Sequence, residues 1–324
     1  MSAKRFAAIT GVGSATPNKV LTNNDLSKIV DTTDEWIRER TGILERRIAE
    51  PHEATSDFAL LAGEKALEMS GISAGGLDAI FVATCTPDTL FPSTACRVQD
   101  RIGAHRAAAM DISAACTGFN YALEVASAYI EAGRAQHVLV AGADTLSKFT
   151  NWKDRSTCVL FGDGAGAVIL SASLQQGIVG SYLRARGSGG PLLCIPGGGA
   201  LSPEDPAYIY MNGKEVFKFA VEVMVESVRK LLDQCGKTLD EIALVIPHQA
   251  NIRIIDMAAK RLSLKRDRLY INLQKYGNTS AASIPLALDE AVRGGNVKEG
   301  DLILLTGFGA GLTYGANIVR WIRA

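Results

Sequence analysis

The sequence has no excess charge of either sign, because its 34 Lys and Arg residues balance its 34 Asp and Glu residues. A chain without a basic excess lacks the usual electrostatic footprint of a nucleic-acid-binding protein. No apolar run approaches the length of a membrane span, and the apolar stretch at the N-terminus is too short for a signal peptide. With 47% hydrophobic and 21% charged residues, the composition is typical of a soluble globular enzyme.

Closely spaced cysteine pairs are also absent. The chain has six scattered cysteines, Cys85, Cys96, Cys116, Cys158, Cys194 and Cys235. They show neither the spacing of a zinc site nor the density of a disulfide scaffold. We therefore expect reduced thiols, a cytoplasmic location and no metal site.

No Pro/Ser-rich linker divides the 324 residues, although a chain this long exceeds the usual size of one hydrophobic core. Instead, a pattern recurs. A helix ending at Gly71 precedes an apolar strand at 79–84, and a helix ending at Gly236 precedes a strand at 242–246, about 165 residues later. The strands 137–142 and 301–307 keep that offset, and each is interpreted as ending in a glycine-rich turn. Two coincidences at one offset favour duplication over chance.

Strands this apolar, alternating with amphipathic helices such as 117–132 and 215–235, belong in sheets covered on both faces. We predict an α/β protein of two similar halves, 1–175 and 176–324. The halves are expected to pack as five layers of helix, sheet, helix, sheet and helix, with a boundary near residues 171–180.

Cys116 is the first candidate for chemistry. A short strand is expected to turn into a long amphipathic helix at this residue. Unpaired N–H groups at a helix N-terminus stabilise a thiolate and lower the thiol pKa. Cys116 is therefore predicted to be a nucleophile, whereas Cys85, Cys158 and Cys235 fit the role of buried structural cysteines.

Two further residues complete a candidate site. His248 follows the strand 242–246, and functional groups collect at the carboxyl ends of strands in such sheets. It is also expected to open a helix at 249–253. Asn278 lies in a Gly-Asn turn, which taken alone indicates only a turn. Together, a thiol, a strand-end imidazole and an amide donor form a known kind of catalytic constellation.

Two glycine-rich segments need separate interpretations. In residues 306–315 the glycines permit close backbone approach, so this turn can present an N–H group to an oxyanion. Residues 161–167 lack the strand, turn and helix context of a dinucleotide site, and their glycines are expected to serve packing.

Seven motifs, in order along the chain, resemble those of the β-ketoacyl-acyl-carrier-protein synthase III family. They are residues 31–43, 91–95, Asp111-Ile-Ser-Ala-Ala-Cys116-Thr-Gly-Phe119, 161–167, Ile246-Pro-His248-Gln-Ala-Asn251, Tyr276-Gly-Asn278-Thr-Ser-Ala-Ala-Ser-Ile-Pro285 and Phe308-Gly-Ala310-Gly311. The resemblance implies a duplicated thiolase fold, a homodimer and the catalytic residues Cys116, His248 and Asn278.

The resemblance also implies a two-stage reaction without a cofactor. Cys116 takes an acyl group from acyl-CoA, with the oxyanion held by the N–H groups of Cys116 and Ala310. Malonyl-acyl-carrier-protein then loses carbon dioxide, and the resulting enolate, stabilised by His248 and Asn278, attacks the acyl-cysteine. The product is a 3-ketoacyl-acyl-carrier-protein that initiates fatty acid synthesis, and ping-pong kinetics are expected.

The remaining site residues follow from the same resemblance. The coenzyme A site is expected to include Trp36, Arg40, Arg155, Phe217 and Asn251. The acyl pocket is expected to include Leu146, Phe161, Leu193, Ile209 and, reaching into the partner subunit, Phe91. The carrier-protein surface is expected to include Lys218, Gln249, Arg253, Lys260 and Arg261. Six basic residues against two acidic ones between residues 253 and 268 can steer an acidic partner, although most such runs are ordinary solvated helices.

Three alternatives stay open at this point. A related thiolase-fold acyltransferase could prime a secondary-metabolite pathway. A scaffold that binds carrier protein could have lost turnover, although all three catalytic residue types are present. A thioester hydrolase is disfavoured because no carboxylate is evident beside His248. The primer chain length is not fixed by the sequence.

Overall fold

The computed structural model describes residues 5–322 of the chain. Its first sheet has five strands in the order β1, β7, β6, β4, β5. Their bounds are Phe6–Ala15 (β1), Asp163–Ser173 (β7), His137–Thr145 (β6), Ala79–Ala83 (β4) and Ala108–Ile112 (β5). Strand β4 is parallel to β5 and β6, whereas β6 pairs with β7, and β7 with β1, in antiparallel fashion.

The second sheet repeats this topology. Its order is β11, β12, β13, β8, with bounds Ile242–Pro247, Leu302–Gly309, Thr313–Arg320 and Ile178–Ala185. Strand β11 is parallel to β12, and the other two pairs are antiparallel, as in the series β4, β6, β7, β1. The second sheet has no full counterpart of β5 among the described residues. In that position Leu269 forms a single parallel bridge to Val245 of β11. The predicted duplication is confirmed.

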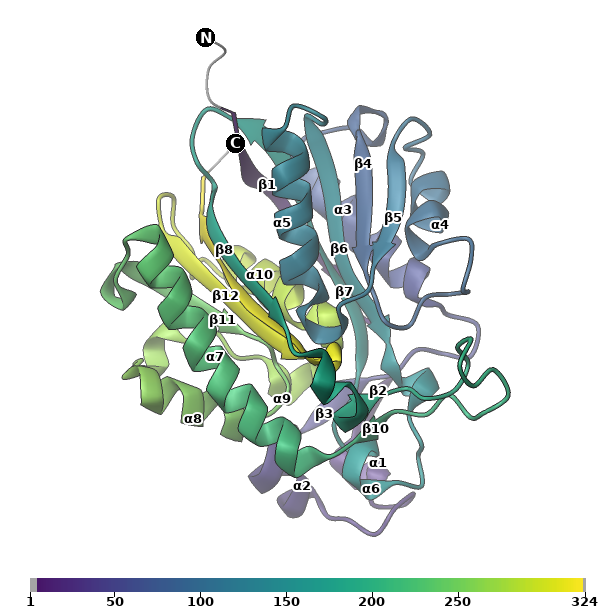
Figure 1. The fold of residues 1–324 in the computed structure, drawn as a ribbon. Coiled ribbons are helices and arrows are strands. Elements are labelled where there is room, and N and C mark those ends of the chain that lie inside the picture. Colours follow the sequence, from purple (N-terminus) through teal and green to yellow (C-terminus); the bar gives the residue numbers. More distant parts are fainter. Residues whose placement is uncertain (1–4, 323–324) are drawn as a thin grey trace.

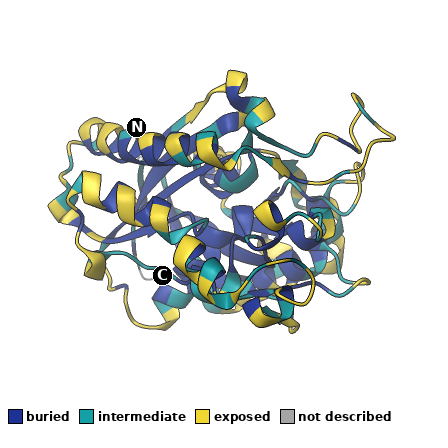
Figure 2. Cartoon of the chain, turned by 90° about the horizontal axis from the view of Figure 1, so that it is seen from below, coloured by how far each residue is buried: buried dark blue, intermediate teal, exposed yellow. Residues whose placement is uncertain are grey.

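The helices form three layers around these sheets (Figure 1). Helices α3 (Thr55–Ser70) and α4 (Thr94–Arg101) cover the outer face of the first sheet. Helices α5 (Gly118–Glu131) and α10 (Ser283–Arg293) lie between the sheets, and α7 (Gly213–Cys235), with α8 (Ile252–Leu262) packed against it, covers the second. Figure 2 shows the outer helices exposed on one side only. The predicted five-layered α/β architecture is confirmed.

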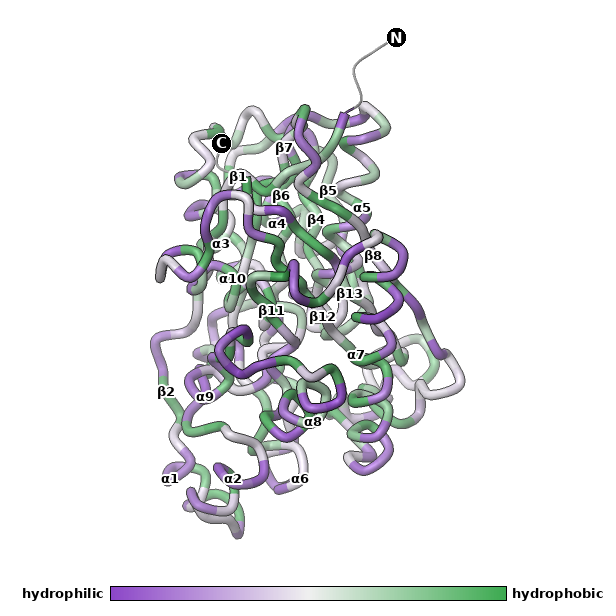
Figure 3. The backbone as a smooth tube through the Cα atoms, turned by 90° about the vertical axis from the view of Figure 1, so that its left-hand side faces the viewer, coloured by the Kyte–Doolittle hydropathy of each residue, from purple (hydrophilic) through white to green (hydrophobic). Residues whose placement is uncertain are grey.

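The largest apolar cluster fills the space between the two sheets. It joins Phe81, Phe119, Leu123, Ile246 and Leu305, none more than 1% exposed. Figure 3 shows hydrophobic segments running through the interior, with hydrophilic ones at the surface. Burial of this apolar area is the main force that holds the halves together.

The glycine-rich turns expected after two strands are wrong. Gly142 and Gly307 lie inside β6 and β12, which run on to Thr145 and Gly309. The physical reason lies in the opposite half of the chain. A Cβ on Gly142 would lie 2.1 Å from the Ala281 carbonyl oxygen, and one on Gly307 would lie 2.9 Å from Asn120 Oδ1. These glycines admit neighbouring chain segments and do not turn the strand.

Short elements gather at one end of the layers (Figure 1). They are β2 (Val20–Thr22), α1 (Asn23–Leu26), α2 (Asp34–Thr41), β3 (Glu45–Arg47), α6 (Arg155–Cys158), β9 (Leu193–Cys194), β10 (Tyr210–Met211) and α9 (Leu273–Tyr276). Between residues 5 and 322, no helix combines the length and apolar character needed to cross a membrane.

Candidate active site

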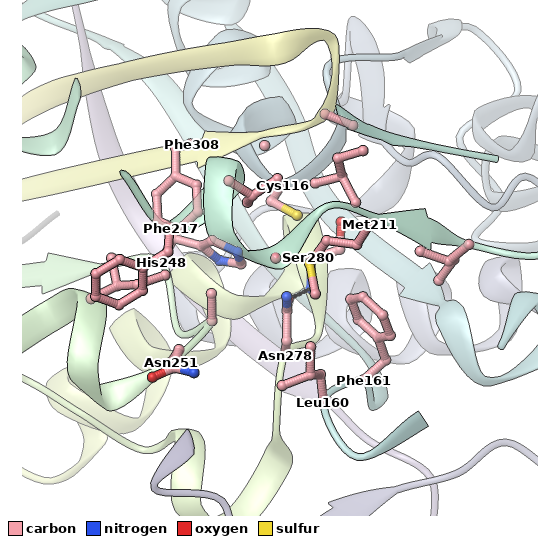
Figure 4. Close-up of a pocket in the computed structure, with 18 of the residues that line it drawn as sticks. Cys116, Leu160, Phe161, Met211, Phe217, His248, Asn251, Asn278, Ser280 and Phe308 are labelled. Atoms are coloured by element: carbon pink, nitrogen blue, oxygen red, sulfur yellow. Dashed lines mark hydrogen bonds between the residues drawn. The ribbon is translucent and has the colours of Figure 1, made fainter. Parts of the chain in front are cut away.

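A pocket of about 810 Å³ opens where residues of both halves meet. Cys116, His248 and Asn278 all line it, and Figure 4 shows their side chains converging on one space. Cys116 comes from the first half of the chain, and the other two come from the second. The structure therefore brings the three predicted catalytic residues together.

Cys116 lies in a short 3-10 turn, Ala115–Thr117, between β5 and α5. The residue before it, Ala115, has a φ of 45°, in the left-handed region that side chains rarely adopt. Gly309 packs directly against the nucleophile, since a Cβ there would lie 2.6 Å from the Cys116 nitrogen. The chain can place β12 beside Cys116 only because position 309 has no side chain.

The pKa of Cys116 is shifted in the direction opposite to the sequence prediction. Burial raises the pKa of this thiol to about 12, and nearby Asp144 also raises it, while Ser280 lowers it. Burial disfavours the charged thiolate, and it outweighs the helix N-terminus because the second half encloses the thiol. At rest the Cys116 side chain is therefore a neutral thiol, which needs a proton acceptor if it is to act as the predicted nucleophile.

His248 directly follows β11, as predicted, but the helix after it begins only at Ile252. Its Nδ1 lies 2.7 Å from Ser283 Oγ, and its ring meets Phe308 edge to face at 5.2 Å. Burial lowers the pKa of His248 to about 3, so the imidazole is neutral. Within the described residues its Nε2 has no hydrogen-bond partner, which leaves this atom for a substrate.

Asn278 is held by its own backbone and by its side-chain oxygen. Its N–H donates to Leu160 O at 2.8 Å, and its carbonyl accepts from Gly162 N at 3.0 Å. Its Oδ1 accepts from Ser280 N at 2.9 Å. No residue of the described chain bonds to its Nδ2, so the amide presents two donor hydrogens to the pocket.

Ala310 lines the pocket immediately after β12. The Thr313 hydroxyl lies 3.0 Å from Ala310 O and 2.9 Å from Ala114 O. This contact ties the segment of the predicted second oxyanion donor to the segment that carries Cys116. The alanine keeps its backbone N–H, which is the group that the prediction requires.

The predicted coenzyme A residues surround the pocket on one side. Trp36, Arg40, Phe217 and Asn251 line it. Arg155 does not, but its guanidinium lies 5.0 Å from the Trp36 ring centroid, and that of Arg40 lies 4.8 Å away. Both guanidinium groups therefore make cation–π contacts with one indole, and their positive charge can attract an anionic group.

Four predicted acyl-pocket residues, Leu146, Phe161, Leu193 and Ile209, line the cavity. Phe91 does not belong to this chain's own pocket. It is 85% exposed, beside Leu90 at 79%, in the connection between β4 and α4. This placement leaves Phe91 free to contact another molecule.

The predicted carrier-protein residues are divided by the structure. Lys218 and Arg253 line the pocket mouth, and Lys260 and Arg261 are exposed on α8. The prediction that Gln249 contacts the carrier protein is wrong, because this residue is only 1% exposed. Its Nε2 donates to Pro247 O and Tyr270 O at 2.7 and 3.2 Å, so it cannot meet a docking protein.

Sequence reasoning missed four pocket or supporting residues. Ser280, Phe308 and Cys85 line the pocket, and Ser283 supports His248. The two serines lie in a run of small residues that suggested only close packing, and Cys85 was interpreted as structural. Along residues 5–322, no group of three or more His, Cys, Asp or Glu side chains is placed to hold a metal ion.

Comparisons with known proteins all point to one family. Two models of the 3-oxoacyl-[acyl-carrier-protein] synthase III family match the chain, one over residues 110–187 and its C-terminal model over residues 232–321. The chain is 54% identical to the beta-ketoacyl-[acyl-carrier-protein] synthase III of Caldanaerobacter subterraneus subsp. tengcongensis, with 100% of both chains covered.

Solved structures give the same result. The 3-oxoacyl-[acyl-carrier-protein] synthase III of Aquifex aeolicus VF5 matches with a TM-score of 0.92 and 50% identity, covering 97% of this chain and 100% of that one. The priming beta-ketosynthase of the R1128 polyketide biosynthetic pathway matches with a TM-score of 0.94 and 36% identity, covering 100% and 98%.

Proposed function

The chain belongs to the β-ketoacyl-acyl-carrier-protein synthase III family, and from that premise we propose how its pocket residues divide the reaction. It is a condensing enzyme that initiates fatty acid synthesis. One observation carries the assignment of roles. Cys116, His248 and Asn278, drawn from two halves of the chain, line a single pocket.

In the first stage Cys116 takes the acyl group of an acyl-CoA. The sulfur attacks the thioester carbonyl, His248 Nε2 accepts the thiol proton, and the proton leaves with the coenzyme A thiolate. A neutral imidazole suits this task because its Nε2 is free to accept. The backbone N–H groups of Cys116 and Ala310 stabilise the oxyanion, and one such donor contributes about 3 kcal/mol.

In the second stage a malonyl group on acyl carrier protein loses carbon dioxide. The enolate oxygen accepts from Asn278 Nδ2 and from His248 Nε2. The enolate carbon attacks the acyl carbonyl, and the cysteine sulfur leaves as a thiolate that takes a proton from solvent to restore the resting thiol. Here His248 must donate where it accepted before. The Ser283 hydroxyl at Nδ1 allows both tautomers, because a hydroxyl can donate or accept.

The other residues in and around the pocket are proposed to bind the substrates. Trp36, Arg40 and Arg155 are proposed to hold the nucleotide end of coenzyme A, with Phe217 and Asn251 along the channel. Leu146, Phe161, Leu193 and Ile209 are proposed to receive the acyl chain. Lys218, Arg253, Lys260 and Arg261 are proposed to attract the acidic carrier protein. The proposed reaction needs no cofactor, and the proposed location is the cytoplasm.

The proposed assembly is a homodimer. Strand β5 is an edge of the first sheet, and exposed apolar side chains lie near it: Leu90, Phe91 and Met110, the last 42% exposed. An unpaired edge with apolar neighbours favours association with a second copy.

Within each copy, we propose two halves, 1–175 and 176–324. The strands of the first sheet span residues 6–173 and those of the second span 178–320.

A direct experiment tests the roles. The enzyme is incubated with a panel of acyl-CoAs, and intact mass identifies those that acylate it. Malonyl-acyl-carrier-protein is then added, and carbon dioxide and the β-ketoacyl product are measured. Cys116→Ala should abolish both acylation and condensation. If this variant condenses as fast as wild type, the proposal is wrong. An acylated wild-type enzyme that yields only free acid would instead identify a thioester hydrolase.

The 36% identity to a priming polyketide synthase gives the second candidate, a primer of a secondary-metabolite pathway. The same assay distinguishes the two, because each carrier protein can be offered in turn. A fatty-acid role predicts faster turnover with the carrier protein of fatty acid synthesis. Faster turnover with a polyketide carrier would favour the second candidate.

A further inference from the structure

Arg46, on the short strand β3, carries a cation that is wholly buried. The residue is 0% exposed and is one of the largest fully buried side chains. Burial lowers the pKa of Arg46 to about 10, so the guanidinium remains charged at neutral pH. Within residues 5–322 it forms no ion pair, and its three hydrogen bonds go to neutral oxygens. Burying an unpaired charge is costly, so we looked for a role of the Arg46 guanidinium in the hydrogen bonds that it makes.

One end of the guanidinium fixes the segment that pairs with Asn278. Nη2 donates to Val159 O at 2.8 Å. The next residues, 160–162, form a parallel bridge with Asn278 through the bonds from Asn278 N to Leu160 O and from Gly162 N to Asn278 O. Thus the carbonyl bound by Arg46 and the carbonyl that holds Asn278 belong to consecutive residues, Val159 and Leu160.

The stem of the side chain supports the same bridge. A Cβ on Gly162 would lie 3.1 Å from Arg46 Cβ, and one on Gly277, which has a φ of 64°, would lie 3.4 Å from it. Gly277 directly precedes Asn278. Arg46 therefore packs against both strands of the bridge while its guanidinium holds one of them.

The other end of the guanidinium is anchored outside the pocket. Nη1 donates to Leu21 O at 3.1 Å and to Asn23 Oδ1 at 2.9 Å. Asn23 in turn donates to Asp34 Oδ1 and Ile43 O at 2.9 and 2.8 Å. These two bonds do not involve Arg46, so α2, which carries Trp36 and Arg40, stays held when the guanidinium is removed.

We propose that Arg46 is a positioning residue for Asn278, required for the decarboxylative stage and dispensable for acyl transfer to Cys116. The inference rests on the role proposed above for Asn278. Arg46 touches no reacting atom. It sets the position of the Asn278 backbone, from which the amide reaches the enolate oxygen, and it leaves the Cys116 and Ala310 donors unaffected.

The test separates the two stages in Arg46→Met. Release of coenzyme A on mixing with acyl-CoA measures loading, and release of carbon dioxide from malonyl-acyl-carrier-protein by acylated enzyme measures condensation. Loading should stay within about threefold of wild type, whereas condensation should fall at least about tenfold, a part of the 10²–10³-fold effect of losing a donor. Arg293→Met is the control. Arg293 also donates to a backbone carbonyl, Val12 O, at 3.1 Å. It differs from Arg46 in being half-exposed and paired with Asp289, and it does not line the pocket, so both rates should stay near wild type.

A second readout distinguishes positioning from general support of the fold. If Arg46 acts through Asn278, adding Arg46→Met to Asn278→Ala causes no further loss of condensation. Multiplying losses, or equal losses of loading and condensation, would overturn the proposal. Arg46→Lys decides the question if Arg46→Met does not fold. A folded lysine variant that condenses like wild type refutes it, and so does failure of both variants to fold. If Asn278→Ala itself condenses normally, the fault lies in the proposed function instead.

Discussion

At the scale of single residues, Cys116 and His248, the proposed nucleophile and proton acceptor, are both uncharged at rest. Burial raises the pKa of Cys116 to about 12 and lowers that of His248 to about 3. The two shifts have one cause, since a desolvated site disfavours both thiolate and imidazolium. These shifts favour proton transfer together with attack on the thioester over a standing thiolate–imidazolium pair.

The lowered pKa of His248 has a consequence for stability. Between pH 6.5 and about 3 the unfolded chain binds a proton at this residue and the native protein does not. Stability then rises with pH in this window and falls as pH decreases, by about 1.4 kcal/mol per unit. Urea unfolding of wild type and His248→Gln at pH 7 and pH 5 measures the effect. Wild type should lose about 2 kcal/mol relative to the variant, whereas parallel curves would contradict the shift.

Ser283 is expected to control the orientation of His248. Removing its hydroxyl in Ser283→Ala eliminates the 2.7 Å contact to Nδ1, and both loading and condensation should slow by about tenfold. Single-turnover assays of each stage check this expectation. Ser227→Ala is the control, because the buried Ser227 hydroxyl has no hydrogen-bond partner among residues 5–322. That variant should keep wild-type rates and gain about 1 kcal/mol of stability.

At the scale of elements, the end of β12 shapes the environment of the nucleophile. A methyl group at position 309 would lie 2.6 Å from the Cys116 nitrogen and 3.1 Å from its Cβ. Gly309→Ala should therefore push the two segments apart, displace the oxyanion donors and slow acyl loading by about 10²–10³-fold.

Gly75→Ala provides the comparison for this substitution, because a Cβ there would have no atom of the described part of the chain within 4 Å. Circular dichroism and melting temperature report folding in both variants. A Gly309→Ala enzyme that loads acyl groups at the wild-type rate would show that the close contact has no catalytic role.

Element types were largely predictable from the sequence, and their surroundings were not. Local periodicity predicts the helices that end at Ser70 and Cys235. It also predicts the strands that end at Ala83 and Pro247, each end to within one residue. Gly142 was wrongly assigned to a turn. A glycine is required there because the carbonyl of Ala281, 139 residues later in the chain, packs too close for a side chain.

The same limit applies to the candidate site. That Cys116, His248 and Asn278 belong to one site was predictable because their motifs are local, and the structure places all three in one pocket. Their catalytic roles stay a prediction. The raised pKa of Cys116 was not predictable, since it depends on how deeply the other half buries the thiol. Gln249 lies within a family motif, yet its amide is used inside the fold. Ala115 and Ser280, with φ values of 45° and 51°, have conformations that their residue types do not suggest. The division at residues 175 and 176 stays a prediction.

At the scale of the whole molecule, the proposed dimer depends on the region around Leu90 and Phe91. Replacing both by Asp places two charges where an apolar interface is expected, so the variant should be monomeric in sedimentation experiments at concentrations where wild type is dimeric. Leu174→Asp is the control, since Leu174 is equally exposed at 78% but follows β7. Dissociation of the control as well, or a dimeric Leu90→Asp/Phe91→Asp variant, would contradict the proposed interface.

The repeated topology also constrains how this protein can change over time. Gly142 in the first half leaves room for Ala281 of the second half, which lies just before the inner helix α10. In the same way, Gly307 in the second half leaves room for Asn120 on the inner helix α5 of the first half. The two halves thus pack through equivalent, complementary contacts, as two identical subunits would if they became joined in one chain. After such a fusion, one copy could specialise in the nucleophile and the other in the donors, but neither could drift alone. A side chain gained at the seam in one half requires a matching loss in its former twin.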